Sequence, residues 1–148
     1  MQADRVIEEV EQRCLRDSLR LTPTRKRVLE LVLAADGPIK AYELLDRLKE
    51  EQPNAAPPTV YRALDFLLDH HFIHRLETLN AFVSCFHPEH RHDGRFLICE
   101  SCETVTEIPE SVESAEIQSF AADRGFRPAR EVLEVYGRCA ACRDGKRG

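Results

Sequence analysis

Two Cys-x-x-Cys pairs constrain the fold of this chain more than any other feature of its sequence. The first pair is Cys99 and Cys102, and the second is Cys139 and Cys142. Thiolates with this spacing on a tight turn can both reach one cation, so two pairs supply the four ligands of a tetrahedral structural zinc site. The gap between the pairs is longer than in a compact zinc ribbon. We therefore expect zinc to join the parts of a small subdomain; the alternative is two disulfides or four unrelated buried thiols.

The N-terminal segment bears on the choice between metal and disulfide. It is rich in charged residues and has no apolar signal segment, and no apolar run in the 148 residues approaches membrane-spanning length. We therefore expect a cytoplasmic protein with no membrane partner. Cytoplasmic thiols remain reduced, which favours a metal over disulfides at the cysteine pairs.

The charge is distributed unevenly. The formal net charge is −5, which on its own argues against nucleic acid as a partner. Residues 13–27, however, contain six basic residues against one acidic residue, a local balance of +5. Such a basic segment on an acidic protein can bind phosphate, and the alternative is a helix face exposed to water. The basic residues are Arg13, Arg16, Arg20, Arg25, Lys26 and Arg27.

The first half of the chain has the pattern of a winged helix-turn-helix domain, which we assign to residues 1–84. Apolar spacing predicts helices over about residues 3–20, 23–35, 40–52 and 58–71, with Thr22 as the N-cap of the second. The first helix would place Val6, Val10 and Leu15 on its apolar side. Alternating segments at 72–77 and 80–85 predict a two-stranded wing. In this architecture the last helix enters the major groove of DNA with its N-terminal residues nearest the bases.

The second half, residues 85–148, reads as a small α/β unit. Strands are predicted in RFLICES and TVTEI, a helix over about 111–124, and a last strand over about 131–136 that leads to the second cysteine pair. The predicted fold class is therefore α+β. This half is too small to bury a large core alone, so we expect it to dimerise.

Three segments resemble the ferric uptake regulator family of bacterial metal-sensing transcription factors: LTPTRKRVL, PPTVYRALDFLLDHHFIHRLE, and FLICESCETVTEI joined to the later CAAC. The resemblance covers nearly the whole chain and is strongest to the zinc-sensing branch. It implies a homodimer that represses transcription by binding double-stranded operator DNA, and it implies neither catalysis nor a small-molecule substrate. A zinc hydrolase or deaminase would need an open coordination position and a nearby general base. A zinc-ribbon interaction module would leave His74, His92 and Glu107 without a role.

The resemblance also implies two zinc ions per chain. The structural site matches the four cysteines of the two pairs, and the regulatory site matches His74, Cys85, His92 and Glu107. Thiolate with imidazole favours zinc over ferrous iron or manganese. The alternative is a family member that senses iron, manganese, nickel or peroxide. Taken singly, His74 could be a half-exposed strand histidine, Glu107 a surface carboxylate and Cys85 a packing residue.

Three further residues in the histidine-rich loop, His87, His90 and Asp93, depart from the dense cluster of iron-sensing members. We interpret them as loop residues or as partners of the ligands rather than as a third metal site.

The predicted DNA contacts centre on Arg62, because an arginine near the start of a recognition helix can reach guanine O6 and N7. Its alternative role is an ion pair with Asp65 or Asp69 on the same helix. The other predicted contacts are Thr59, Tyr61 and Tyr42 in the groove, and Arg25, Lys26 and Arg27 on phosphates. Core packing is the alternative for Tyr42.

Overall fold

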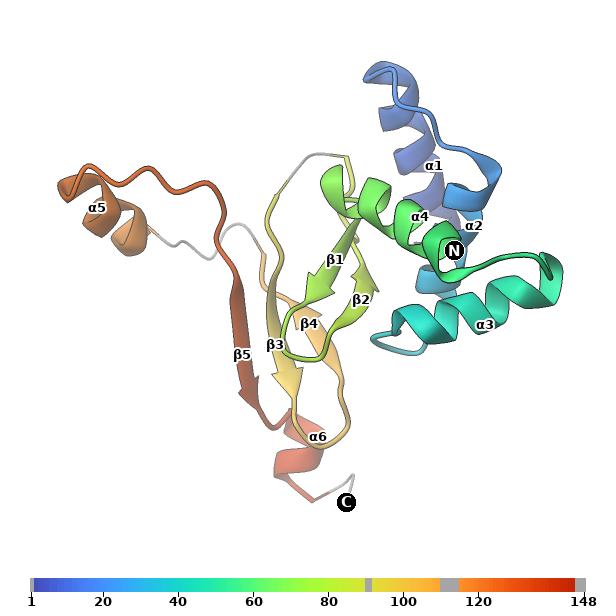
Figure 1. Cartoon of the computed structure of the whole chain (residues 1–148). Coiled ribbons are helices and arrows are strands. Elements are labelled where there is room, and N and C mark those ends of the chain that lie inside the picture. Colours follow the sequence, from blue (N-terminus) through green and yellow to red (C-terminus); the bar gives the residue numbers. More distant parts are fainter. Residues whose placement is uncertain (1, 90–91, 110–114, 146–148) are drawn as a thin grey trace. The chain divides into compact units, whose positions relative to one another are not determined.

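The computed structural model describes residues 2–89, 92–109 and 115–145, and the chain divides into two compact units, Met1–His92 and Asp93–Gly148 (Figure 1). The sequence prediction placed the boundary after residue 84. Residues 86–89 belong with the first unit, because arginine side chains of its first helix donate hydrogen bonds to their backbone carbonyls. Arg5 donates to Phe86, and Arg13 donates to Pro88.

The first unit begins with four helices, as predicted: α1 (Gln2–Arg16), α2 (Pro23–Ala34), α3 (Ala41–Glu51) and α4 (Pro57–Asp69). Thr22 caps α2 by accepting a hydrogen bond from the backbone of Arg25. Apolar residues at helical spacing, such as Val10, Leu44 and Leu64, meet in one buried core. Leu15 was wrongly predicted on the apolar side of α1. Its side chain is 83% exposed, because it lies on the helix face opposite the buried stripe of Val6, Val10 and Cys14.

A two-stranded wing follows the helices, as predicted. Strands β1 (Ile73–Leu76) and β2 (Ala81–Ser84) pair antiparallel, with His74 opposite Val83. Asn80 adopts a left-handed backbone with φ of 50° at the turn, a conformation that asparagine tolerates better than most residues. A bridge between Ile39 and Phe82 ties the wing to the segment before α3. The unit thus has the winged-helix arrangement.

The second unit contains a three-stranded sheet in the order β4-β3-β5. Its central strand β3 (Arg95–Cys99) pairs antiparallel with β4 (Val105–Glu107) and parallel with β5 (Leu133–Gly137). Helix α5 (Ala115–Asp123) lies between β4 and β5 in the sequence, and its predicted start at Ser111 is outside the described residues. A short helix, α6 (Ala140–Arg143), was not predicted.

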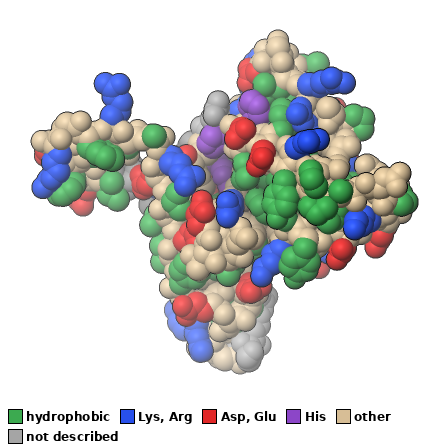
Figure 2. All heavy atoms as spheres, in the orientation of Figure 1, with side chains coloured by type: hydrophobic (Ala, Val, Ile, Leu, Met, Phe, Trp, Pro, Cys, Tyr) green, Lys and Arg blue, Asp and Glu red, His purple; other side chains and the backbone are tan. Residues whose placement is uncertain are grey.

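Large apolar side chains are exposed on the described part of the second unit, taken by itself. Figure 2 shows hydrophobic side chains on the surface of α5. Ile117 and Phe120 of this helix are each 59% exposed. Others lie on the sheet, at Leu97 and Val135. Exposed apolar surface of this kind marks a protein interaction surface, in agreement with the predicted need for a dimer. Among the helices of the described residues, none is both long and apolar enough to cross a membrane.

Candidate metal centres and nucleic-acid surface

The two cysteine pairs come together in the second unit. Cys99 is the last residue of β3, and Cys102 lies in the turn that follows. Cys139 is the N-cap residue of α6, and Cys142 lies within that helix. Their four Sγ atoms all lie within 4.8 Å of one another, and those of Cys102 and Cys139 are 3.7 Å apart. Two thiolates on a tetrahedral zinc, with bonds of about 2.3 Å, stand about 3.8 Å apart. The cluster therefore fits zinc, and none of the six cysteines is in a disulfide.

The sheet register explains why pairs so far apart in sequence meet. β3 and β5 run parallel with Cys99 opposite Gly137, so both strands deliver their cysteines at the same end of the sheet. The turn after β3 places Glu103 in the left-handed region, with φ of 60°, and its N–H donates to the carbonyl of Cys99. The N–H of Cys139 in turn donates to the sulfur of Cys99 at 3.4 Å.

These surroundings shift two thiol pKa values in opposite directions. Backbone N–H groups of Cys102 and Cys139 stabilise the thiolate of Cys99 and hold its pKa below the usual value. Burial raises the pKa of Cys142 to about 12, and hydrogen bonds with the neighbouring thiols act in the same direction. A divalent cation would supply the positive charge that four clustered thiolates need.

Three of the four donors predicted for the regulatory site converge in the first unit. The ligand atoms of His74, Cys85 and His92 lie within 4.8 Å of one another. Cys85 Sγ and His92 Nε2 are 3.4 Å apart, and the rings of His74 and His92 have centroids 5.1 Å apart. A sulfur and a nitrogen bound to one tetrahedral zinc stand about 3.5 Å apart, given bonds of about 2.3 and 2.0 Å. The sulfur–nitrogen spacing is thus right for zinc.

The wing positions these donors. His74 lies in β1 with its side chain buried, and Cys85 follows β2 directly. The N–H of Cys85 donates to the carbonyl of Phe72 at 3.2 Å, which fixes the backbone of the thiol residue next to β1. His92 is half-buried. Glu107, the fourth predicted donor, belongs to β4 of the second unit and is half-buried there.

The other residues of the histidine-rich loop have separate partners. His87 is exposed and lies 3.5 Å from the carboxylate of Glu89. Asp93 accepts a hydrogen bond from the backbone of Glu131 at 2.9 Å. His90 lies outside the described residues. These contacts agree with loop roles for His87 and Asp93.

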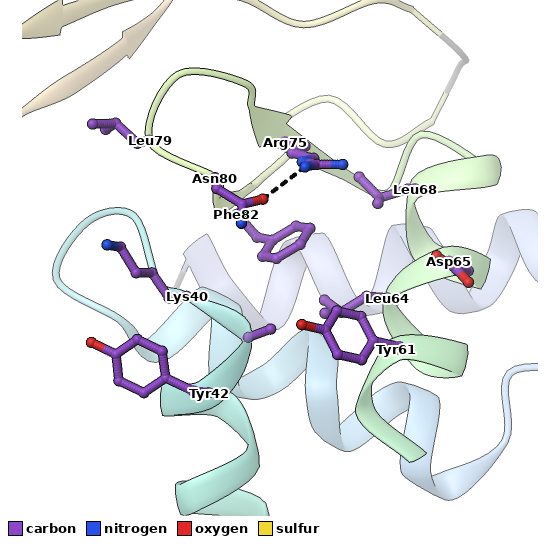
Figure 3. Close-up of a pocket in the computed structure, with 11 residues that line it drawn as sticks. Lys40, Tyr42, Tyr61, Leu64, Asp65, Leu68, Arg75, Leu79, Asn80 and Phe82 are labelled. Atoms are coloured by element: carbon purple, nitrogen blue, oxygen red, sulfur yellow. Dashed lines mark hydrogen bonds between the residues drawn. The ribbon is translucent and has the colours of Figure 1, made fainter. Parts of the chain in front are cut away.

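Two of the predicted groove contacts line a cavity of about 490 Å³ in the first unit (Figure 3). Tyr42 on α3 and Tyr61 on α4 line it and are 64% and 53% exposed, so the core-packing alternative for Tyr42 is wrong. Lys40 lines the same cavity, as do two wing residues: Arg75 donates to Asn80 Oδ1 at 2.8 Å. Aromatic, amide and basic groups around one concave surface can contact bases and phosphates of DNA.

The remaining candidates for DNA contact, Arg62 and Thr59, differ in exposure and in hydrogen bonding. Arg62 is exposed in the first turns of α4. Thr59 is half-buried, and its hydroxyl accepts a hydrogen bond from the N–H of Ala56 at the start of the helix. This capping contact occupies part of the hydrogen-bonding capacity that the groove role would need.

The three basic residues predicted on phosphates each have a partner within the first unit. Arg25 donates to the carbonyl of Arg20 at 2.7 Å, and its guanidinium lies 4.1 Å from the centre of the Phe66 ring. Lys26 pairs with Glu11 at 3.0 Å, and this hydrogen bond raises the pKa of Lys26. Arg27 pairs with Glu51 at 2.6 Å. To bind phosphate, these side chains would have to exchange or share such contacts.

Sequence reasoning grouped Arg13 with that basic segment, and this was wrong. Its side chain is 3% exposed, lies over the Phe72 ring and donates to the carbonyl of Pro88. The helical spacing indicated that Arg13 is buried, because Arg13 continues the buried stripe of Val6 and Val10. An arginine at a core position indicates a specific partner rather than solvent.

Comparison with known proteins agrees with this picture. Residues 16–136 match the model of the ferric uptake regulator family. The zinc uptake regulation protein of Escherichia coli K12 is 43% identical over 139 residues, which cover 93% of this chain and 81% of that protein. A solved zinc uptake regulator complexed with zinc and DNA matches with a TM-score of 0.91 and 39% identity, covering 99% of this chain and 98% of that one. The holo crystal structure of XcZur matches with a TM-score of 0.86 and 45% identity, covering 93% and 96%.

Proposed function

The chain belongs to the ferric uptake regulator family, and on that premise we propose that it is a zinc-responsive transcriptional repressor. Zinc acts as co-repressor, and the protein binds operator DNA of zinc-uptake genes as a homodimer. The observation that carries the proposal is the convergence of His74, Cys85 and His92 within the unit that also holds the winged helix. We expect it to act in the cytoplasm, where a bacterial repressor meets its operator, and to regulate rather than catalyse.

The donor set supports zinc as the sensed metal. A thiolate and two imidazoles form a soft, tetrahedral environment, whereas iron(II) and manganese prefer sites richer in oxygen and of higher coordination number. The relatives that match at 43% and 39% identity are zinc regulators. The alternative is a family member that senses iron, manganese, nickel or peroxide, because peroxide-responsive and ferric uptake repressors also match at lower identity.

We assign two roles to the two donor clusters. Cys99, Cys102, Cys139 and Cys142 would hold a structural zinc that stabilises the second unit. His74, Cys85 and His92 would hold the regulatory zinc, with Glu107 as the fourth ligand from the second unit. A cation bound by donors from both halves of the chain supplies a fixed link between the DNA-reading half and the dimerisation half.

Such a link explains how zinc supply controls DNA binding. A dimer binds an operator tightly only when its two recognition helices are spaced to enter successive grooves. The metal-bound donors favour that arrangement, and by linkage operator DNA tightens zinc binding by the same factor. Taking DNA binding from nearly off to nearly on requires about 5.5 kcal/mol of differential affinity, which one closed zinc site can supply.

The first test replaces the regulatory thiol. Cys85→Ser should lower the zinc content from two ions per chain to one and abolish zinc-dependent operator binding, while the protein remains a folded dimer. The matched control is Cys14→Ser, the same change at a buried thiol outside both clusters, which should keep two zinc ions. Metal analysis, size-exclusion chromatography and operator titration give the three readouts.

Retention of two zinc ions and of zinc-dependent DNA binding in Cys85→Ser would contradict the assignment. Operator titrations of the wild-type protein with zinc, iron(II), manganese and nickel at one salt concentration identify the sensed metal. We expect the tightest operator binding with zinc at the lowest free metal concentration. A stronger response to another metal, or to peroxide, would favour the alternative.

A further inference from the structure

We propose that three arginines of α1, Arg5, Arg13 and Arg16, are positioning residues for the regulatory metal site. They hold the ligand loop, which we define as residues 86–89 and which directly follows the thiol ligand Cys85. The inference rests on the proposed function, because it assumes that Cys85 and His92 bind the regulatory metal. It adds that the first helix of the DNA-binding unit sets the affinity of that site.

Each arginine donates a hydrogen bond to a different backbone carbonyl of the ligand loop. The bonds are Arg5 Nη2 to Phe86 O at 2.8 Å, Arg13 Nη1 to Pro88 O at 3.1 Å, and Arg16 Nη2 to Glu89 O at 3.3 Å. Within residues 86–89 the structure has no helix or strand. In a helix or strand these carbonyls would accept backbone N–H groups. Here, guanidinium groups are the donors to three of the four carbonyls of residues 86–89.

Arg13 connects the loop to the thiol ligand from a second direction. Its guanidinium lies 4.6 Å from the centre of the Phe72 ring, and the carbonyl of Phe72 accepts the N–H of Cys85. The Arg13 side chain is 3% exposed, and its ion-pair partner is Asp17 at 3.5 Å. A buried guanidinium is costly unless its donors are used, so this residue disfavours loop conformations that remove the Pro88 carbonyl.

Neighbouring carboxylates orient the two exposed arginines. Arg5 pairs with Glu9 at 2.7 Å, and Arg16 lies 3.7 Å from Asp17. Each side chain is thereby constrained on the helix before it contacts the loop. A loop that is ordered in the metal-free protein loses less conformational entropy when its flanking ligands bind a cation, which raises affinity without a new bond to the metal.

The main test is a double variant, Arg5→Gln with Arg16→Gln, in the full-length protein with the four-cysteine site loaded. Both side chains are largely exposed, 42% and 62%, so the fold should persist. Competition with a chromophoric chelator should show zinc affinity at the regulatory site weakened about tenfold, the low end for residues that orient metal ligands. Arg13→Met, which keeps an apolar stem, should weaken it further, towards about a hundredfold.

The matched control is Arg47→Gln, which removes the same charge from an exposed position on α3 and should leave zinc affinity unchanged. Two readouts separate positioning from ligation. Cobalt bound at the regulatory site should keep its thiolate charge-transfer band in the double variant, because Cys85 remains a ligand. With the regulatory site empty and the four-cysteine site loaded, amide hydrogen exchange at Phe86, His87 and Glu89 should be faster in the double variant than in wild type.

Zinc affinity and loop exchange equal to those of wild type in the Arg5→Gln, Arg16→Gln variant would overturn the inference while leaving the proposed function intact. If the wild-type chain itself binds one zinc ion only, both the proposed function and this inference are overturned. Should Arg13→Met fail to fold, the double variant carries the test alone.

Discussion

At the scale of single residues, Arg62 is the residue predicted to contact a base of the operator. It is exposed near the start of α4, beside Tyr61, where an arginine can contact guanine O6 and N7 together. Arg62→Ala should weaken operator binding by about 1–3 kcal/mol and relax the sequence preference. Titrations of operator and random DNA at equal salt measure both effects. An equal loss on the two DNAs would contradict base reading and assign Arg62 to phosphate.

The metal donors differ in how far the sequence alone predicts them. The four cysteines follow from their spacing, because a Cys-x-x-Cys turn is a local structure. His74, Cys85 and His92 were predicted only through the family resemblance, since they meet through the β1–β2 pairing and the loop after Cys85. No pattern of neighbouring residues in the sequence predicts that these three side chains meet. The assignment of Glu107 to the site stays a prediction.

Side-chain partners were the least predictable feature. A count of charges gave residues 13–27 a single role, yet Arg13 is buried and Arg27 is paired with Glu51 on another helix. Such contacts depend on how α1, α2 and α3 pack, and packing is a tertiary property that composition does not report. Only the place of Arg13 on the buried stripe was visible in the sequence.

At the scale of secondary-structure elements, local rules predicted most of the first unit. Thr22 with Pro23 gave the start of α2, and the wing followed from alternating residues on both sides of a turn. The parallel pairing of β3 with β5 could not be predicted, because it joins strands separated by α5 and depends on long-range contacts. Helix α6 is only four residues long, too short for a periodic signal.

That parallel pairing leads to a prediction about the structural cluster. Cys99→Ser should remove one zinc ligand at the end of β3 and destabilise the second unit, so that the chain becomes monomeric or partly unfolded. The loss should be large, because structural zinc sites contribute apparent binding energies of about 10–16 kcal/mol in small domains. Thermal unfolding and size-exclusion chromatography measure this loss of stability.

The critical comparison is with Cys85→Ser, which should remain a folded dimer. Identical behaviour of the two variants would contradict the division into structural and regulatory sites.

At the scale of the whole molecule, the charge and the composition of the two units support one functional account. The chain is acidic overall, with a net charge of −5, so its affinity for DNA must come from a limited basic and aromatic surface rather than from bulk attraction. The first unit has a surface of this kind around Tyr42, Tyr61 and Arg75. The second unit exposes apolar side chains, which suit the dimer that the proposed function requires.

The most direct test of the account is operator binding by the wild-type protein as a function of free zinc, at constant salt, with bound zinc counted at each point. We predict that the chain with one zinc ion binds the operator no better than random DNA, and that tight binding appears together with the second zinc ion. Operator DNA should in turn tighten that second ion by the same factor. Tight operator binding by protein that holds a single zinc ion per chain, unchanged by added zinc, would contradict the account.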